Sequence, residues 1–166
     1  IDIVKVSVDI LCNLKDNSID IYLSYLLWSQ SFEELKKSLI INSLGKSREN
    51  EKISANLHIV SALVTYCFIS SEILTLKNLI TSLESIGHPC GLTALKYLEK
   101  SKLEGISEFA TKAIQVVRSK NLEISDDFEK CLDCTDIYFL PKDRISTLEP
   151  CEIYKEKIQY DPYDKN

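Results

Sequence analysis

The fold is decided by residues 57–89, which read LHIVSALVTYCFISSEILTLKNLITSLESIGHP. Residues 57–69 carry the clearest apolar pattern in the chain, which predicts one long helix that begins at Ile53 or Leu57. In residues 73–86, apolar side chains recur at the i, i+3, i+4 spacing that predicts a second helix. Gly87 and Pro89 then end this helix, because glycine readily takes the left-handed conformation of a helix cap and proline cannot continue the helix.

Helical spacing continues on both sides of this pair. Residues 1–14 alternate like a strand in their first half and fit a helix in their second half, so we predict a helix with a short strand as the alternative. A turn is expected at residues 15–18 and a charged connector at residues 46–52. Besides the central pair, helices are predicted over residues 1–14, 19–28, 32–45, 92–98 and 103–120.

Two polar segments and one glycine are expected to mark helix ends. Ser31 followed by Glu34 matches a capping box, in which each side chain accepts a hydrogen bond from a backbone N–H at the helix start. Residues 70–72 (Ser-Ser-Glu) offer a cap and an acidic first turn for the helix that follows them. Gly45 is expected to stop the helix that begins after Ser31.

The composition favours a single, mostly helical domain. The chain has 166 residues, of which 45% are hydrophobic and 27% are charged, and a chain of this kind can bury a core without disulfides or metal. Gly and Pro are scarce, with four of each. This scarcity argues against an all-β fold, which needs many tight turns, and against a disordered chain.

Two helix pairs follow one another, in residues 55–86 and 90–119, and each has about the length of a helical-repeat unit. On these helix lengths the chain resembles the armadillo and HEAT class of stacked helix pairs, although the two pairs share no residue motif. An irregular helical bundle accounts for the pattern almost equally well. We therefore predict an all-α fold, either an irregular helical bundle or a short stack of helix pairs, in a domain of residues 1–134.

The chain changes character after Cys134. Prolines interrupt it, and isolated apolar residues are interleaved with charges, so we predict an extended C-terminal segment over residues 135–166. This segment is too apolar for a solvated linker and is expected to pack on the helical domain or on a partner. The residues that we expect to bind a partner are its aromatic ones: Tyr138, Phe139, Tyr154, Tyr160 and Tyr163.

Charge and hydropathy limit the classes of partner. The net charge is −5, so no general basic field exists to hold a nucleic-acid backbone, and direct binding of nucleic acid is not expected. No segment reaches the roughly 18 apolar residues of a membrane span, and the first residues lack the pattern of a signal peptide. The chain begins at Ile1 and contains no Met, so we expect a fragment or a processed product.

The six cysteines are irregularly spaced. Cys12 and Cys67 lie in apolar helical patterns, as reduced cysteines do, which predicts an intracellular protein of the nucleus or the cytoplasm.

Cys131 and Cys134 form the pattern that comes nearest to a metal site. They are separated by two residues, the spacing at which two thiolates hold one zinc ion or form a redox dithiol. Cys151 is the nearest further ligand, with His88 or Cys90 as a fourth. Because this spacing matches no structural zinc module, we expect ordinary thiols and no bound metal.

The parts of an enzyme are missing from the sequence. The chain has two histidines, and His58 lies in an apolar helix, where a packed core residue is expected, so a histidine-based nucleophilic site is hard to build. With glycines only at positions 45, 87, 91 and 105, no phosphate-binding loop can be written. No catalytic residue and no cofactor are expected.

The aromatic and basic residues of the first helices are expected to have structural roles rather than binding roles. Tyr22, Tyr25 and Trp28 are a candidate binding anchor, but their neighbours are apolar too, so we expect them in the core. Four basic residues are expected to form a solvated helix end rather than a basic patch: Lys36, Lys37, Lys46 and Arg48.

These observations favour a non-enzymatic α-helical domain that binds another protein, as a scaffold or adaptor within a larger protein or complex. A partner helix or peptide would bury its apolar stripe on the helices, and a hetero-oligomer is compatible with this. One alternative is a compact helical regulator, viral or host, that holds a partner helix in a groove. A second alternative is a zinc-binding protein that uses Cys131 and Cys134.

Overall fold

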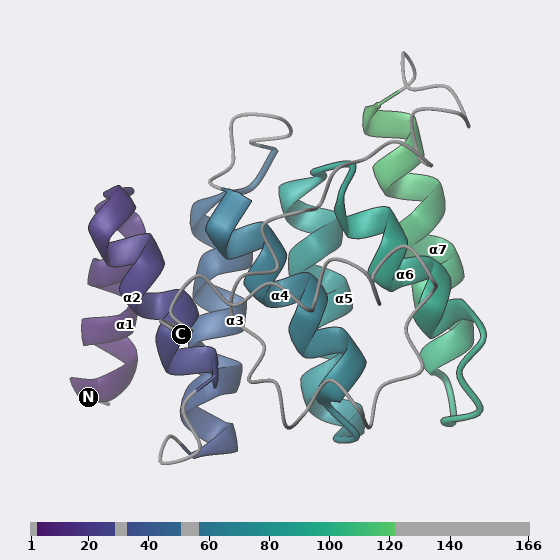
Figure 1. The fold of residues 1–166 in the computed structure, drawn as a ribbon, viewed down its shortest axis with the longest axis horizontal. Coiled ribbons are helices and arrows are strands. Elements are labelled where there is room, and N and C mark those ends of the chain that lie inside the picture. Colours follow the sequence, from purple (N-terminus) through teal and green to yellow (C-terminus); the bar gives the residue numbers. More distant parts are fainter. Residues whose placement is uncertain (1–2, 29–32, 51–56, 122–166) are drawn as a thin grey trace, which may run out of the picture.

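The computed structural model describes residues 3–28, 33–50 and 57–121, and every regular element in these ranges is an α-helix (Figure 1). The described helices are α1 (Ile3–Asn13), α2 (Asn17–Trp28), α3 (Glu34–Ser47), α4 (Leu57–Ile69), α5 (Ile73–Ile86), α6 (Gly91–Glu99) and α7 (Ile106–Lys120). The prediction of an all-α fold is therefore confirmed. The predicted extended segment over residues 135–166 lies outside the described residues.

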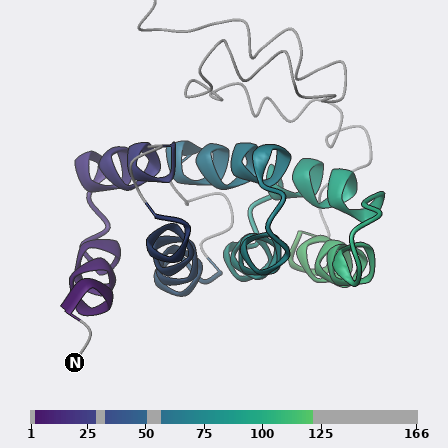
Figure 2. The ribbon, with the colours of Figure 1, turned by 90° about the horizontal axis from the view of Figure 1, so that it is seen from below.

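The described helices form two layers (Figure 2). The layer of α2, α4 and α6 is called the even layer here, and the layer of α1, α3, α5 and α7 the odd layer. Helices of the odd layer all run in one direction, and those of the even layer run in the opposite direction (Figure 1). Within each layer every helix contacts the next one along: α1 with α3, α3 with α5, α5 with α7, α2 with α4 and α4 with α6.

Contacts between the layers follow the predicted helix pairs. Residues 55–86 were expected to form one pair and residues 90–119 another, and the structure has α4 in contact with α5 and α6 in contact with α7. No residue motif is repeated between these pairs, so the resemblance to armadillo and HEAT proteins stays a prediction.

The core lies between the two layers, with α4 at its centre. Every side chain from Ile59 to Phe68 is buried, as expected for a helix that carries no charged residue. Ser61 and Thr65 are the polar exceptions to its apolar character, and the Thr65 hydroxyl donates to the Ser61 carbonyl at 2.7 Å, which satisfies the buried oxygen. Despite this apolar centre, no helix among the described residues is long and apolar enough to span a membrane.

The predicted end of α5 is confirmed. Gly87 has φ of 72°, in the left-handed region, and its N–H donates to the Leu83 carbonyl at 2.9 Å. Two side chains from the end of α7 bind the last carbonyls: Lys120 Nζ donates to Glu84 O at 2.8 Å, and Asn121 Nδ2 donates to Gly87 O at 2.8 Å. This helix end is thus fixed by both local backbone geometry and a distant segment.

Gly45 does not stop α3, which continues to Ser47, so this prediction was wrong. A Cβ atom on Gly45 would lie 2.8 Å from the Cα of Ser82 in α5. The glycine therefore allows α3 and α5 to approach closely, and Ser82 Oγ donates to the Ile41 carbonyl at 2.8 Å across the same contact.

Three expectations about how helices begin were also wrong. Glu34 is the first residue of α3, rather than the third, and Ser31 lies outside the described residues, so no capping box includes Glu34 as its third helical residue. At α5 the cap position is Glu72, whose side chain makes no capping hydrogen bond. The last helix begins at Ile106, after Gly105 with φ of 73°, rather than at Leu103.

Candidate interaction surface

The residues predicted to bind a partner lie outside the described part of the chain, as do the three candidate metal ligands. This holds for Tyr138, Phe139, Tyr154, Tyr160, Tyr163, Cys131, Cys134 and Cys151. The side chains of His58 and Trp28 are also outside it. The candidate surface is therefore built from residues 3–28, 33–50 and 57–121.

His88 and Cys90, the other predicted ligands, are both buried next to the end of α5. The Cys90 N–H donates to His88 Nδ1 at 3.1 Å, so this imidazole nitrogen is an acceptor. Burial lowers the pKa of His88 to about 4, which favours the neutral ring. Within the described ranges, no group of three His, Cys, Asp or Glu side chains is placed to hold a metal ion.

The expected solvated basic end of α3 is not formed. Lys37 is buried, its Nζ lies 3.3 Å from Glu34 Oε1 and 5.3 Å from the centre of the Tyr66 ring, and the Tyr66 hydroxyl donates to Glu34 at 2.7 Å. Arg48 is buried as well. These two basic side chains therefore hold helices together instead of forming a surface patch or a solvated end.

Arg48 fixes the first two helices on α3. Its Nη2 lies 2.6 Å from Asp20 Oδ1 in α2, and its Nη1 donates to the carbonyl of Cys12 in α1 at 2.9 Å. Ser43 in α3 also donates to the Asp9 carboxylate of α1. These polar contacts join α1 and α2 to α3 and hold the two helices in place.

Helix α1 is apolar on two opposite sides. Val8 and Cys12 are buried on one side. The residues Ile3, Val6, Ile10 and Leu14 have exposures of 76%, 44%, 58% and 58%, and we call them the α1 stripe. With 3.6 residues per turn, Ile3, Val6 and Ile10 fall within a sector of about 60° opposite the buried side, and Leu14 directly follows the last helical residue, Asn13. Lys5 and Asp9, the charged residues of α1, lie outside this sector.

Helix α2 adds an exposed aromatic face at the same end of the stack. Ile21, Tyr22 and Tyr25 are exposed, and the one charged residue of α2, Asp20, is buried. The expectation that Tyr22 and Tyr25 lie in the core was therefore wrong. Their neighbours Leu23 and Leu27 fill the core side of the helix instead, which leaves the tyrosines on the opposite side.

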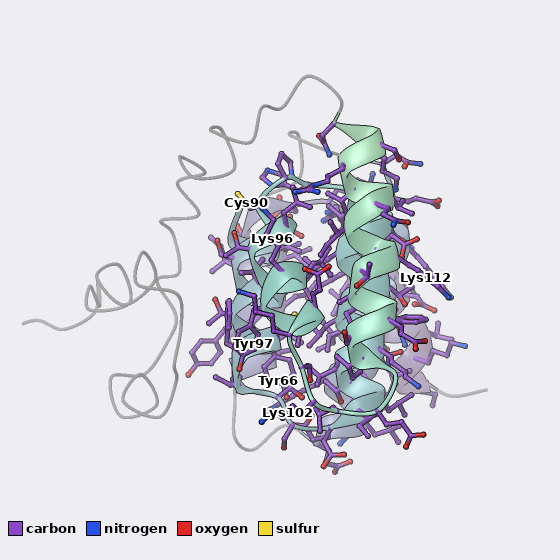
Figure 3. All side chains as sticks on the ribbon, turned by 90° about the vertical axis from the view of Figure 1, so that its right-hand side faces the viewer. Tyr66, Cys90, Lys96, Tyr97, Lys102 and Lys112 are labelled. Carbon is purple, nitrogen blue, oxygen red and sulfur yellow. The ribbon has the colours of Figure 1, made fainter. Side chains whose placement is uncertain are left out.

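The other end of the odd layer is different. Along α7 the exposed side chains opposite its buried side are Glu108, Lys112, Gln115 and Ser119, which we call the α7 stripe. Figure 3 views the stack from this end, with Lys112 pointing away from the other helices. The α7 stripe is thus polar, as expected for a surface that water covers, whereas the α1 stripe is aliphatic and uncharged.

An exposed, uncharged surface of aliphatic and aromatic side chains is chemically suited to contact with another apolar surface. Among its named residues, the polar groups are the hydroxyls of Tyr22 and Tyr25. A sequence signal for it exists, because α1 has apolar residues both at the spacing of Val8 and Cys12 and at the spacing of Ile3, Val6 and Ile10. The strand-like alternation in the first half of residues 1–14 obscures this second face in the sequence.

Comparisons with known proteins identify no relative of the chain. No family model matches the chain, and neither a curated protein nor a solved structure matches it.

Proposed function

We propose that this protein is a non-enzymatic interaction domain whose α1–α2 end binds another protein. The observation that carries the proposal is the α1 stripe, an exposed and uncharged aliphatic face at the end of a helix layer. Tyr22 and Tyr25 of α2 extend this surface with side chains that are common in interfaces, since each combines a large apolar area with a hydroxyl group.

Binding at this surface would be driven by the removal of exposed aliphatic side chains from water. Complete burial of one Val, Leu or Ile side chain is worth about 1.5–3 kcal/mol. The four residues of the α1 stripe are 44–76% exposed, so a partner that covers them gains a large part of this energy at each position. The alternative of a groove that holds a helix is not needed, because the stripe lies on one convex helix.

The test is a double substitution, Val6→Glu with Ile10→Glu, in the full chain. Both side chains are exposed, so the domain is expected to keep its helical circular-dichroism spectrum and its melting temperature. Quantitative mass spectrometry of proteins that co-purify with the chain should show loss of the partner. The proposal is wrong if the folded double variant retains every partner of the original chain.

Two further variants serve as controls for this test. Gln115→Glu with Ser119→Glu adds the same charge to the α7 stripe and should leave the partner bound, because this stripe is already polar. A third variant replaces the five aromatic residues predicted to bind a partner, Tyr138, Phe139, Tyr154, Tyr160 and Tyr163, with serine. Loss of the partner in this third variant alone would move the binding surface from α1 to the C-terminal segment.

A further inference from the structure

We infer that the C-terminal segment of this chain packs across the outer side of the even layer, with residues 137–140 on helix α4. This surface is separate from the α1–α2 end, so the inference goes beyond the proposed function and does not depend on it. Three observations support it: α4 is buried on every side, the described helices surround it in part, and the last 45 residues have the length and the sequence to cover the rest.

Helix α4 is buried on all of its sides. The residues from Ile59 to Phe68 are each at most 7% exposed, and successive residues are about 100° apart, so together they sample every side of the helix. The interior helix of the odd layer differs. In α3, Leu35 is 71% exposed and Lys46 is exposed as well, on the side opposite the buried Leu44. That interior helix leaves its outer side to water, and α4 does not.

The described helices account for the inner side and the two flanks of α4. Helices α2 and α6 contact it within the even layer, and α5 contacts it from the odd layer. The Tyr66 hydroxyl of α4 donates to Glu34 of α3, so this side chain points to the odd layer. Ser61, Val64 and Phe68 lie about 140–160° around the helix axis from Tyr66, and we call them the outer side of α4.

The outer side of α4 is covered although no described helix lies beyond the even layer (Figure 2). Val64 is 0% exposed and Ser61 is 5% exposed. Tyr97 of α6 lies against Phe68, with 4.7 Å between the ring centres, and covers this end of the outer side. The cover over Ser61 and Val64 is therefore assigned to residues of the chain outside the described ranges.

Residues 122–166 are the segment that is long enough to supply this cover. Residues 51–56 lead into the first turn of α4, whose Val64 is about 10 Å further along the axis, and residues 29–32 join α2 to α3, so both are short and tied at each end. The last 45 residues leave α7 at the end of the stack where α4 begins (Figure 1). At about 3.3 Å per residue, the chain from Asn121 to residue 137 reaches about 50 Å, which exceeds the breadth of two packed helices at about 10 Å each.

The order of residues in this segment matches the surface that it would cross. Residues 123–136 contain six acidic side chains and one basic side chain. Helix α6 lies between α7 and α4, and Lys96 and Lys100 project away from its buried side, so opposite charges would meet there. Residues 137–140, Ile-Tyr-Phe-Leu, are the longest uninterrupted apolar run of the segment. This run has the most to gain from packing on the outer side of α4.

Thiol labelling in the full chain tests this inference. Ser61→Cys is a small change at the outer side of α4, and Leu35→Cys is the exposed reference on α3. We expect N-ethylmaleimide to modify residue 61 about tenfold more slowly than residue 35, because a covered thiol reacts when its cover opens. Adding Tyr138→Asp with Phe139→Asp should raise the rate at residue 61 by about tenfold, since two charges would no longer pack there. Tandem mass spectrometry of peptides distinguishes residue 61 from Cys67.

Tyr160→Asp with Tyr163→Asp is the matched control, because it adds the same charge to the segment outside residues 137–140 and should leave residue 61 protected. Circular dichroism checks that each variant keeps its helices. A benzophenone amino acid in place of Phe139 gives a second readout that introduces no charge. It should crosslink to α4 or α6 of the same chain on irradiation, whereas the same group in place of Tyr163 should not.

Several results would overturn the inference. Rapid modification of residue 61 in the full chain would show that the outer side of α4 is open. Slow modification that Tyr138→Asp with Phe139→Asp leaves unchanged, or that the control pair relieves equally, would show that other residues cover it. A crosslink from position 139 to a different protein, to a second copy or to another helix would move residues 137–140 to another surface. The α1 stripe is tested separately by Val6→Glu with Ile10→Glu, so either proposal can fail without the other.

Discussion

Arg48 Nη2 and Asp20 Oδ1 lie 2.6 Å apart, and both side chains are buried. The same guanidinium donates to the carbonyl of Cys12, so one side chain from the end of α3 connects α2 and α1. A buried charge without its partner is costly, because the surrounding protein replaces its water poorly.

We expect Arg48→Ala to destabilise the protein by about 3–5 kcal/mol, because the Asp20 carboxylate would remain buried without its partner. The double variant Arg48→Met with Asp20→Leu removes both charges and should cost much less than the single substitution. Urea unfolding followed by circular dichroism measures both values. A change below about 1 kcal/mol for Arg48→Ala, the range of exposed ion pairs, would contradict the burial of this pair.

Gly45→Ala should also destabilise the protein, although alanine is the better helix former by about 1 kcal/mol. The new Cβ would lie 2.8 Å from the Cα of Ser82, so α3 and α5 must separate, at a cost of about 1–3 kcal/mol. Gly91→Ala is the matched control, because its Cβ would meet Leu83 at an ordinary 3.5 Å. Equal unfolding midpoints in urea for the two variants would show that α3 and α5 do not approach this closely.

Stability should fall in mild acid because of His88. Burial lowers its pKa from 6.5 to about 4, so the unfolded chain binds the proton first as the pH falls. The contribution of His88 is complete above about pH 6.5 and is lost progressively toward pH 4, to a total of up to about 3 kcal/mol.

The variant His88→Asn isolates this contribution. Asparagine keeps an acceptor for the Cys90 N–H and does not titrate. The free energy of unfolding, measured in urea at several pH values, should therefore decline less steeply in the variant between pH 6.5 and about pH 4. Carboxylates contribute equally to both proteins, and identical slopes would exclude a buried neutral His88.

Two buried thiols should resist alkylation in the folded protein. Burial raises the pKa of Cys12 to about 12 and also raises the pKa of Cys67, so the reactive thiolate is scarce at neutral pH. After treatment with N-ethylmaleimide, peptide mass spectrometry should find both residues unmodified in buffer and modified in urea. Modification of Cys67 in buffer at the rate seen in urea would show that α4 is not buried at this position.

Much of the fold was predictable from local pattern. Helix α4, which ends at Ile69, and helix α5, which begins at Ile73, follow from apolar spacing. The end of α5 at Gly87 follows from the conformational freedom of glycine. Both signals act within a few residues. Side-chain caps were less predictable, as Glu34 and Glu72 show, because packing of the whole helix outweighs the small energy of one cap.

The sequence alone determined that this chain forms helices and where most of them lie, since backbone preferences and apolar periodicity are local properties. Only the tertiary structure decided that Arg48 is buried, that Gly45 serves a helix contact, and that Tyr22 and Tyr25 face outward. The α1 stripe belongs to this second group. A helix with two apolar sides has the same sequence whether one side or both are covered, and which side is covered depends on the neighbours that the whole chain supplies.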